Sequence, residues 1–399
     1  MLLDAVNERL GVEITGTSIQ VSGISNDSND IQAGYIFAAL PGVHHHGIVF
    51  ASDAIDKGAV AILTDATGAG QILTEVPLIV VDNPRVMMAM YAKEIHGDPF
   101  SSLLTIGVTG TNGKTTTTHM IANALTQNGF NPLLIGTLGF RYKGEYASTH
   151  RTTPESCVLY REVQSAYQAG ANSVVMEVSS HALALDRVAG IMFDVAIFTG
   201  LSPDHLDFHG TMEDYYQAKK KLFSPTFAKS AIVCIDDEWG RRLSAEIDIP
   251  TTTYTTLDTK AQWAMRNYQI SPQGFGVFSV EHEAESFEMN VSMPGLFNAA
   301  NALATLACSD FLNLDSRKVA SSLESVSVKG RLERIDIGQD FSVLVDYAHT
   351  PDAVERVLAI ARQIAGNHRV ITVLGCGGNR DSLKRPLMGA LAASASDLF

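Results

Sequence analysis

The stretch LLTIGVTGTNGKTTTT, residues 103–118, combines three local patterns. Residues 103–108 form an apolar run typical of a buried strand, residues 110–113 contain two glycines typical of a turn, and a helical pattern begins at Lys114. Strand, glycine turn and helix in this order are the layout of a phosphate-binding loop, because backbone N–H groups and the helix N-terminus attract phosphate oxygens. We therefore predict a phosphate site here.

Two side chains strengthen this interpretation. Lys114 would neutralise phosphate charge, and the hydroxyl of Thr115 would bind Mg²⁺. The standard pattern has Gly five residues before Gly113, whereas this chain has Val108 there and carries Gly110 instead, so the stretch is a variant. A helix-capping turn without a ligand is the alternative, but capping alone does not account for Gly-Lys-Thr after an apolar strand.

Composition limits the class of protein. A chain of 399 residues with 46% hydrophobic and 18% charged residues predicts two or three ordered globular domains. The 29 basic and 43 acidic side chains give a net charge of −14, which argues against a general nucleic-acid binder. The four cysteines show no paired spacing, the first residues hold too short an apolar run for a signal peptide, and no uncharged apolar stretch of about 18 residues occurs in the sequence. We expect a cytoplasmic protein without a membrane segment.

The pattern of elements predicts α/β units in series. Residues 1 to about 100 alternate short strands with helices, and residues 103 to about 328 repeat strand and helix, which predicts a parallel sheet. Alternating segments at 275–281 and 286–292 predict antiparallel strands at one edge of that sheet. A third unit from about 330 has predicted strands at 341–345 and 370–374 and helices at 351–364 and 387–395. Because a further strand would be expected next, we predict a truncated domain or an exposed sheet edge.

Polar residues follow the predicted central strands. Glu177 lies at the end of the predicted strand 173–178, where side chains reach the ligand crevice, and is a candidate Mg²⁺ ligand. The alternative is a structural glutamate whose carboxylate interacts with a helix N-terminus. His205 and His209 have the spacing of a helical zinc site, but neighbouring glycine and proline predict a loop, and the oxygen-rich surroundings favour Mg²⁺. In the lysine run 219–221, two side chains are expected to be solvated.

Two residues near the predicted third unit are also candidates. Arg331 lies at the proposed domain join, from which an arginine can swing toward a phosphate when domains close. Asp346 ends a predicted strand and could accept hydrogen bonds from ribose hydroxyls. The three histidines at 44–46 invite a metal assignment, but neighbours in a loop point in different directions.

Eight motifs resemble, in order, those of the Mur ligases. They are GTNGKTT (110–116), TTPE (152–155), EVSSH (177–181), DHLDFHG (204–210), Asn298, GRLE (330–333), DYAHTP (346–351) and GCGGNRDSLKRP (375–386). The resemblance runs the length of the chain. It implies a three-domain α/β architecture: a UDP-sugar-binding domain at 1–100, a central parallel-sheet phosphate-loop ATPase domain at 101–328, and an incomplete Rossmann-like amino-acid-binding domain at 329–399.

Within this family, the motifs most closely resemble those of the member that extends the peptidoglycan stem peptide. It implies an ATP-dependent amide ligase that joins meso-diaminopimelate to UDP-N-acetylmuramoyl-L-alanyl-D-glutamate through an acyl phosphate, with ATP and Mg²⁺, as a cytoplasmic monomer. An L-lysine-adding ligase and a truncated nucleotide- and UDP-sugar-binding form with little activity remain alternatives. The TTPE motif and the 330–351 motifs argue against a folylpolyglutamate synthetase-like ligase.

The resemblance also implies residue roles. The implied nucleotide residues are Gly110, Thr111, Asn112, Gly113, Lys114, Thr115, Thr116, Asn298, Arg331 and Asp346. The implied Mg²⁺ ligands are Thr115, Glu177, His205 and Lys219, the last carrying a carbamate formed from CO₂. The implied substrate residues are Ser28, His44, Thr152, Thr153, Ser179, Arg187, Arg380, Asp381 and Lys384. The implied catalytic residues are Lys114, His205, Lys219 and Arg331.

The chain departs from the family pattern at several positions. Gly200 stands where Asn is usual, and Leu185, His46, Ile48 and Asn379 are further departures. The family's Asp-Asn-Pro-Arg specificity motif would lie past residue 399. The same letters at 82–85 fall in the first unit and are a coincidence, so the sequence leaves the choice between diaminopimelate and lysine open.

Overall fold

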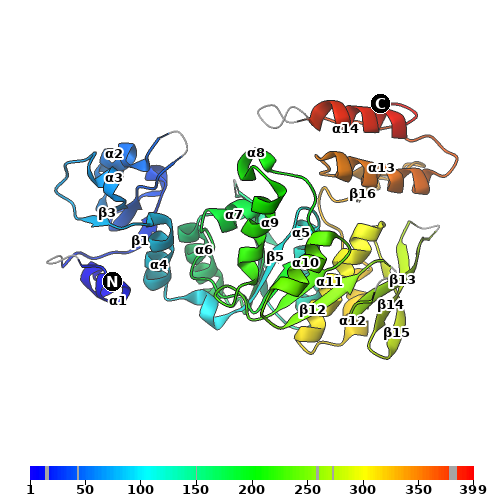
Figure 1. Cartoon of the computed structure of the whole chain (residues 1–399), viewed down its shortest axis with the longest axis horizontal. Coiled ribbons are helices and arrows are strands. Elements are labelled where there is room, and N and C mark those ends of the chain that lie inside the picture. The colour runs from blue at the N-terminus through cyan, green and yellow to red at the C-terminus, as the bar shows by residue number, and fades with distance from the viewer. Residues whose placement is uncertain (14–17, 43–44, 150, 258–259, 272–273, 377–383) are drawn as a thin grey trace. The chain divides into compact units, whose positions relative to one another are not determined.

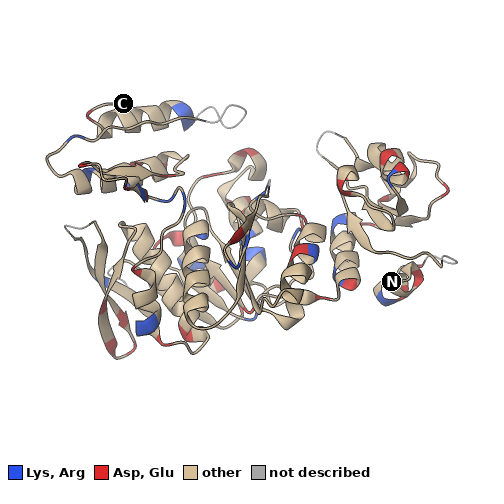
Figure 2. Ribbon diagram, turned by 180° about the vertical axis from the view of Figure 1, so that it is seen from behind, with Lys and Arg blue, Asp and Glu red and all other residues tan. Residues whose placement is uncertain are grey.

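The computed structural model describes residues 1–13, 18–42, 45–149, 151–257, 260–271, 274–376 and 384–399. Backbone contacts divide the chain into two compact units (Figure 1). The first contains Met1–Thr105 and Asn131–Asp194, and the second contains Ile106–Phe130 and Val195–Phe399. Acidic and basic residues are interspersed along the ribbons of both units (Figure 2). Within the described residues, no helix combines the length and the apolar composition that a membrane span requires.

The first unit begins with a small parallel sheet. Its strands lie in the order β1 (Gly23–Ser25), β2 (Tyr35–Ala38), β3 (Ala59–Thr64) and β4 (Leu78–Val80). The helices of this part are α1 (Leu3–Leu10), α2 (Ala51–Asp56), α3 (Ala66–Ala69) and α4 (Pro84–His96). Phe37 and Ile62 are buried with Ala51 and Ala54 in one apolar cluster. The predicted alternation of strands and helices around a separate core is confirmed.

The rest of the first unit is a second strand group. β9 (Ser173–Glu177) pairs in parallel with β6 (Pro132–Gly136), which continues antiparallel into β7 (Gly139–Tyr142) and β8 (Glu145–Ala147). The strand predicted at 173–178 corresponds to β9, whereas β7 and β8 were missed. α6 (Ser156–Gln168) packs against α4, and α7 (Ser180–Ala184) follows β9.

The second unit contains the strands around the glycine turn. β5 (Leu104–Thr109) pairs in parallel with β10 (Val195–Phe198), followed by β11 (Ala231–Cys234), β12 (Thr251–Thr255) and β13 (Trp263–Ile270). β14 (Gly276–His282) and β15 (Glu285–Val291) then add antiparallel, so the predicted antiparallel edge is confirmed. The helices are α5 (Lys114–Gln127), α8 (Leu206–His209), α9 (Met212–Lys220), α10 (Glu238–Glu246), α11 (Leu296–Phe311) and α12 (Ser316–Leu323).

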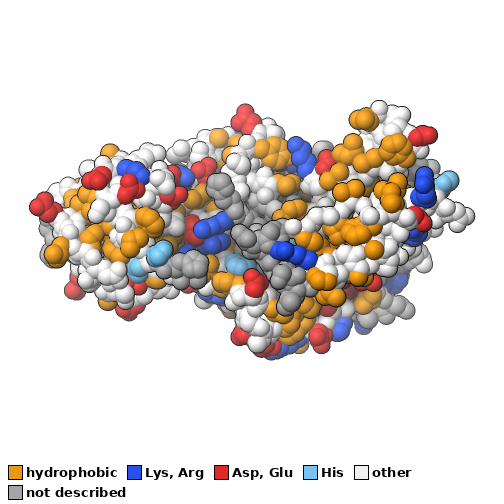
Figure 3. All heavy atoms as spheres, turned by 90° about the horizontal axis from the view of Figure 1, so that it is seen from above, with side chains coloured by type: hydrophobic (Ala, Val, Ile, Leu, Met, Phe, Trp, Pro, Cys, Tyr) orange, Lys and Arg blue, Asp and Glu red, His pale blue; other side chains and the backbone are white. Residues whose placement is uncertain are grey.

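The C-terminal part of the second unit differs from prediction. β17 (Val343–Val345) pairs antiparallel with β16 (Glu333–Ile335), while α13 (Pro351–Ala365) and α14 (Lys384–Ala395) pack together. The prediction of a strand at 370–374 was wrong: only Ile371 makes an isolated bridge, with Leu398. A strand needs a partner ladder, and the described neighbour here is the short segment 397–398. Hydrophobic side chains gather on this part of the surface (Figure 3), including the exposed Val373, Leu387, Leu398 and Phe399.

Gly240 provides a test of how tightly α10 packs on β11. A Cβ at Gly240 would lie 1.8 Å from the carbonyl oxygen of Cys234, whereas a Cβ at Gly389 in α14 would meet nothing within 4 Å. We expect Gly240→Ala to lower the free energy of unfolding by about 1–3 kcal/mol through overpacking. Gly389→Ala, the matched control, is expected to be neutral or stabilising by up to about 1 kcal/mol. Urea titration followed by circular dichroism measures both; equal midpoints for the two variants would contradict the packing.

Candidate active site

The glycine turn at 110–113 joins β5 to α5. Gly110 and Gly113 have φ values of 151° and 86°, and a Cβ would lie 2.0 Å from Thr199 Oγ1 at Gly110 and 2.6 Å from Asn301 Oδ1 at Gly113. Glycine is therefore required at both positions by space, and at Gly113 by backbone conformation as well. Lys114 begins α5, and its Nζ donates hydrogen bonds of 2.9 Å to the carbonyl oxygens of Gly110 and Thr111. The predicted strand, turn and helix are confirmed.

Neighbouring elements hold the turn in place. Thr199 Oγ1, just after β10, donates to the carbonyl oxygen of Asn112 at 2.6 Å, and Thr111 N–H donates to the carbonyl oxygen of Gly200 at 2.9 Å. Gly200 has φ 119°, so the glycine that departs from the family pattern adopts a backbone conformation that other residues rarely take. Together with Lys114 and the N-terminus of α5, the turn offers donors of the kind that bind a triphosphate.

Lys219 lies against the same turn. Its side chain is 1% exposed, its Nζ donates to the carbonyl oxygen of Gly110 at 2.8 Å, and it lies 4.7 Å from the ring centroid of Tyr215. Burial, with the nearby charge of Lys114, holds the pKa of Lys219 well below its usual range, although Asp204 opposes the shift. Lys219 is thus the buried member of the lysine run, and its neighbours Lys220 and Lys221 are half-buried.

Arg331 reaches the turn from the C-terminal part of the second unit. Its Nη2 donates to Thr115 Oγ1 at 3.0 Å, and its guanidinium lies 4.8 Å from the ring centroid of Tyr347. Asp346 accepts hydrogen bonds from the backbone N–H groups of Leu332 at 2.7 Å and Ala348 at 2.8 Å. Burial raises the pKa of Asp346, against the effect of these hydrogen bonds.

The predicted histidines lie at a short helix. His205 precedes α8 and His209 ends it, so the expectation of a loop was wrong over these four residues. His205 Nε2 lies 3.4 Å from Asp204 Oδ2, and both histidine rings contact Tyr215. Among the described residues, no group of three His, Cys, Asp or Glu side chains is arranged to hold a metal. The metal ligand set therefore stays a prediction.

Asn298 is linked to the phosphate loop through Asn301. Asn298 is buried in α11 and accepts a hydrogen bond of 3.2 Å from Asn301 Nδ2. Asn301 Oδ1 in turn accepts from Thr117 Oγ1 at 3.0 Å. The sequence analysis missed Asn301 and Thr199. A polar residue in an otherwise apolar helix, and a threonine at the carboxyl end of a strand, were the available signals.

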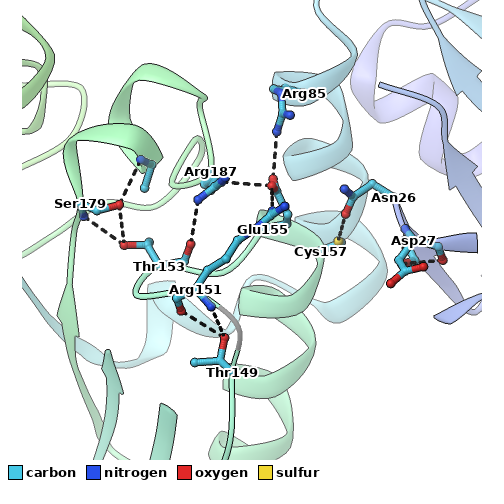
Figure 4. Close-up of polar contacts among 12 residues, drawn as sticks. Asn26, Asp27, Arg85, Thr149, Arg151, Thr153, Glu155, Cys157, Ser179 and Arg187 are labelled. Atoms are coloured by element: carbon cyan, nitrogen blue, oxygen red, sulfur yellow. Dashed lines mark hydrogen bonds and ion pairs between the residues drawn. The ribbon is translucent and has the colours of Figure 1, made fainter. Parts of the chain in front are cut away.

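Three predicted substrate residues of the first unit, Thr153, Ser179 and Arg187, lie together near the end of β9 (Figure 4). Thr153 Oγ1 lies 2.9 Å from the carbonyl oxygen of Glu177 and accepts from Ser179 N–H at 3.0 Å. Ser179 caps α7, and Arg187 Nη1 donates to the carbonyl oxygen of Thr153 at 3.3 Å. The structure therefore brings three of these residues together.

Glu177 and Thr152 are connected through Thr137. Glu177 is 1% exposed and accepts from Thr137 N–H at 2.8 Å and from Thr137 Oγ1 at 3.1 Å. The hydroxyls of Thr137 and Thr152 lie 3.1 Å apart. Thr137, the residue after β6, is therefore one partner of the Glu177 carboxylate.

The remaining predicted substrate residues lie elsewhere. Ser28 is buried at the start of the 3₁₀ helix Ser28–Asp30, which Asp27 caps. Lys384 is half-buried at the start of α14. The predictions at His44, Arg380 and Asp381, and the departure at Asn379, lie outside the described residues.

The turn, its lysines and the parallel strands define the chain as a phosphate-loop nucleotide-binding protein. Three family models match it: "Mur ligase family, catalytic domain" over residues 20–96, "Mur ligase middle domain" over 108–309 and "Mur ligase, glutamate ligase domain" over 330–399. The chain belongs to the Mur ligase family. The predicted three-domain α/β architecture with a central parallel sheet is confirmed.

Three known proteins illustrate the similarity. UDP-N-acetylmuramoyl-L-alanyl-D-glutamate–2,6-diaminopimelate ligase of Streptomyces avermitilis is 41% identical over 98% of this chain and 77% of its own length. A solved structure with the same protein name is 28% identical, with a TM-score of 0.78, covering 98% of this chain and 80% of that one. The MurF ligase of Thermotoga maritima in complex with ADP has a TM-score of 0.62 and 20% identity, covering 86% and 75%, and supports the fold alone.

The buried amine of Lys219 predicts a pH dependence of stability. The unfolded amine keeps its ordinary pKa near 10.5, whereas the folded amine has a lowered one, so the unfolded chain binds more protons between the two values. In CO₂-free buffer, the free energy of unfolding of the wild type minus that of Lys219→Met should therefore rise with pH, by at most about 1.4 kcal/mol per pH unit.

Urea unfolding from neutral pH to about pH 9 measures this difference. The same comparison with Lys220→Met, a half-buried lysine on the same helix, separates burial from the loss of a charge. A difference between wild type and Lys219→Met that is flat or falls with pH would contradict a neutral buried amine.

Proposed function

We propose that the chain is an ATP-dependent amide ligase that joins meso-diaminopimelate to UDP-N-acetylmuramoyl-L-alanyl-D-glutamate in cytoplasmic peptidoglycan synthesis. The observation that carries the proposal is the meeting of two lysine side chains and one arginine side chain at the glycine turn and the start of α5. Lys114 and Lys219 both donate to the carbonyl oxygen of Gly110, and Arg331 donates to Thr115 in the next turn of chain. The name of relatives about 41% identical over nearly the whole chain supports the substrate.

The proposed chemistry has two steps. The γ-carboxylate of D-glutamate attacks the γ-phosphorus of ATP, which forms an acyl phosphate and releases ADP. The amine of the diamino acid then attacks the acyl carbon, loses a proton and expels phosphate, which forms the amide. Lys114 and Arg331 would stabilise the negative charge that develops on the transferred phosphoryl group. The protein otherwise contributes positioning.

We assign the three segments of the chain to three ligands. Residues 1–100 would bind the UDP portion near Ser28, residues 101–328 would bind ATP and the muramoyl-dipeptide, and residues 329–399 would take part in binding the diamino acid near Lys384. Asn298 and Asp346 would lie beside the adenine and the ribose. We propose that the protein acts as a monomer.

Mg²⁺ would neutralise the crowded phosphate oxygens of ATP. Thr115, Glu177, His205 and a carbamylated Lys219 would hold it. The carbamate would form when the neutral amine of Lys219 attacks CO₂ and releases one proton, which turns a buried cation into an anion. The lowered pKa of Lys219 supports this modification, because only the unprotonated amine is nucleophilic.

Ligation assays test the proposed function. We expect ADP release from ATP and Mg²⁺ to require the UDP-sugar dipeptide, and mass spectrometry to detect an amide product with meso-diaminopimelate in preference to L-lysine. Lys114→Ala should lower turnover about 10²-fold or more with an unchanged unfolding midpoint. Lys220→Ala is the control, since Lys220 pairs with Glu246 away from the turn. Preference for lysine would favour the lysine ligase, and nucleotide binding without any product would favour a non-catalytic protein.

A second experiment addresses the carbamate. Lys219→Ala should lose most ligase activity, and acetate or another short carboxylate should restore part of it by replacing the anionic group. Wild-type protein in ¹³C-labelled bicarbonate should give a carbamate signal that Lys219→Ala lacks and that disappears on acidification. Full activity of Lys219→Ala would contradict the modified lysine. So would a ¹³C spectrum of Lys219→Ala that is the same as that of the wild type.

A further inference from the structure

The carboxylate of Glu155 holds three arginines. Glu155 precedes α6 and is 6% exposed; its Oε2 accepts from Arg85 Nη1 at 3.0 Å, and its Oε1 accepts from Arg187 Nε at 3.0 Å. Arg151 Nη1 also donates to Oε1. Figure 4 shows the three guanidinium groups converging on this one side chain. Arg85 comes from α4, whereas Arg151 and Arg187 come from the segments on either side of α6 and β9.

This arrangement concentrates positive charge. Three guanidinium groups and one carboxylate leave a formal charge of +2 at a place where the side chains of Arg187 and Arg85 are only 11% and 22% exposed. Burial lowers the pKa of Arg187, the charges of Arg151 and Arg85 lower it further, and Glu155 opposes the shift. The negative charge of Glu155 therefore offsets part of the repulsion among the three guanidinium groups in a partly buried site.

Glu155 also fixes the orientation of Arg187. A guanidinium is planar and has five N–H donors. Among the described residues, Arg187 donates Nε–H to Glu155 and one Nη1–H to the carbonyl oxygen of Thr153. Two bonds to two separate acceptors define the plane of the group, and three N–H donors of that plane remain for a ligand. Paired N–H donors in one plane match the oxygens of a carboxylate.

We propose that Glu155 is a positioning residue of the substrate site: it orients Arg187 and holds Arg85 and Arg151 beside it, so that the cluster binds a carboxylate of the D-glutamate residue. This inference rests on the proposed function. The inference adds Arg85, an arginine of the N-terminal segment, to the substrate site. Arg85 belongs to the tetrapeptide 82–85, whose likeness to the family's specificity motif is a coincidence. Removal of Glu155 leaves three cations without their common acceptor, so the effect should fall on ligand binding.

Two ligands separate this role from a purely structural one. Calorimetry would compare UDP-N-acetylmuramoyl-L-alanyl-D-glutamate with the same UDP-sugar that ends at L-alanine and lacks the D-glutamate carboxylates. For Glu155→Gln we expect affinity for the longer ligand to fall about tenfold, and affinity for the shorter one to change less than about twofold. In the ligation assay, KM for the UDP-sugar should rise about tenfold, with kcat changed less than about threefold.

A milder variant guards against loss of folding. Arg85→Gln keeps Glu155 and two of its arginines and lowers the formal charge from +2 to +1, so it should show the same selective loss, about threefold or more. Arg9→Gln is the matched control, because Arg9 pairs with Glu94 at the other end of α4 and is largely exposed. It should leave both affinities unchanged.

The outcomes distinguish the two proposals. Equal loss of affinity for both ligands in Glu155→Gln and Arg85→Gln would show that the cluster only maintains the fold. Unchanged affinity for both would show that it does not serve this substrate. Wild-type protein that binds the two ligands equally well would refute the proposed D-glutamate site itself, and the positioning role with it.

Discussion

The carbonyl oxygen of Gly110 accepts hydrogen bonds from two lysine side chains, and this contact holds the glycine turn against α9. Lys114 arrives from the helix that follows, and Lys219 arrives from α9, more than a hundred residues later. Two ammonium groups on one oxygen repel each other, and burial of Lys219 adds to the cost of its charge. Burial and the charge of Lys114 therefore hold the pKa of Lys219 well below its usual range.

The first unit contains the opposite arrangement of charge. There a single buried carboxylate, Glu155, supports three cations and leaves an excess of positive charge. In the second unit, two lysines share an acceptor that carries no full charge, and one of them is favoured without its proton. In both units several basic side chains share one acceptor, which is the side-chain carboxylate of Glu155 in the first unit and the backbone carbonyl oxygen of Gly110 in the second.

Sequence reasoning recovered the elements with strong local patterns. The apolar runs of β5 and β9 and the helix that begins at Lys114 were predicted closely, because burial on both faces produces continuous apolar segments. β7 and β8 were missed because they are short and β8 is exposed. The strand predicted at 370–374 is apolar enough to be one, but a strand also needs a partner, which local composition does not encode.

The site residues also divide into those that a local motif predicts and those that depend on contacts between distant segments. Lys114, Thr115, Arg331 and Lys219 were found by motif, and the structure brings them to one turn. Thr199 and Asn301 act through contacts between distant segments, so no local pattern marks them. Arg85 was set aside because its tetrapeptide copies a motif from another place in the family. Its role depends on Glu155, seventy positions later, and only the folded chain brings the two together.

The bond between Arg331 and Thr115 joins residues 216 positions apart. At the usual pace of synthesis, about 5–20 residues per second, the ribosome needs roughly 10–40 s to progress from one to the other. During that interval β5, the turn and α5 can form from local sequence, and Lys219 can join them about midway. The phosphate loop of the nascent chain is therefore built in stages, and it receives its arginine last, after the whole ATP-binding segment has been made.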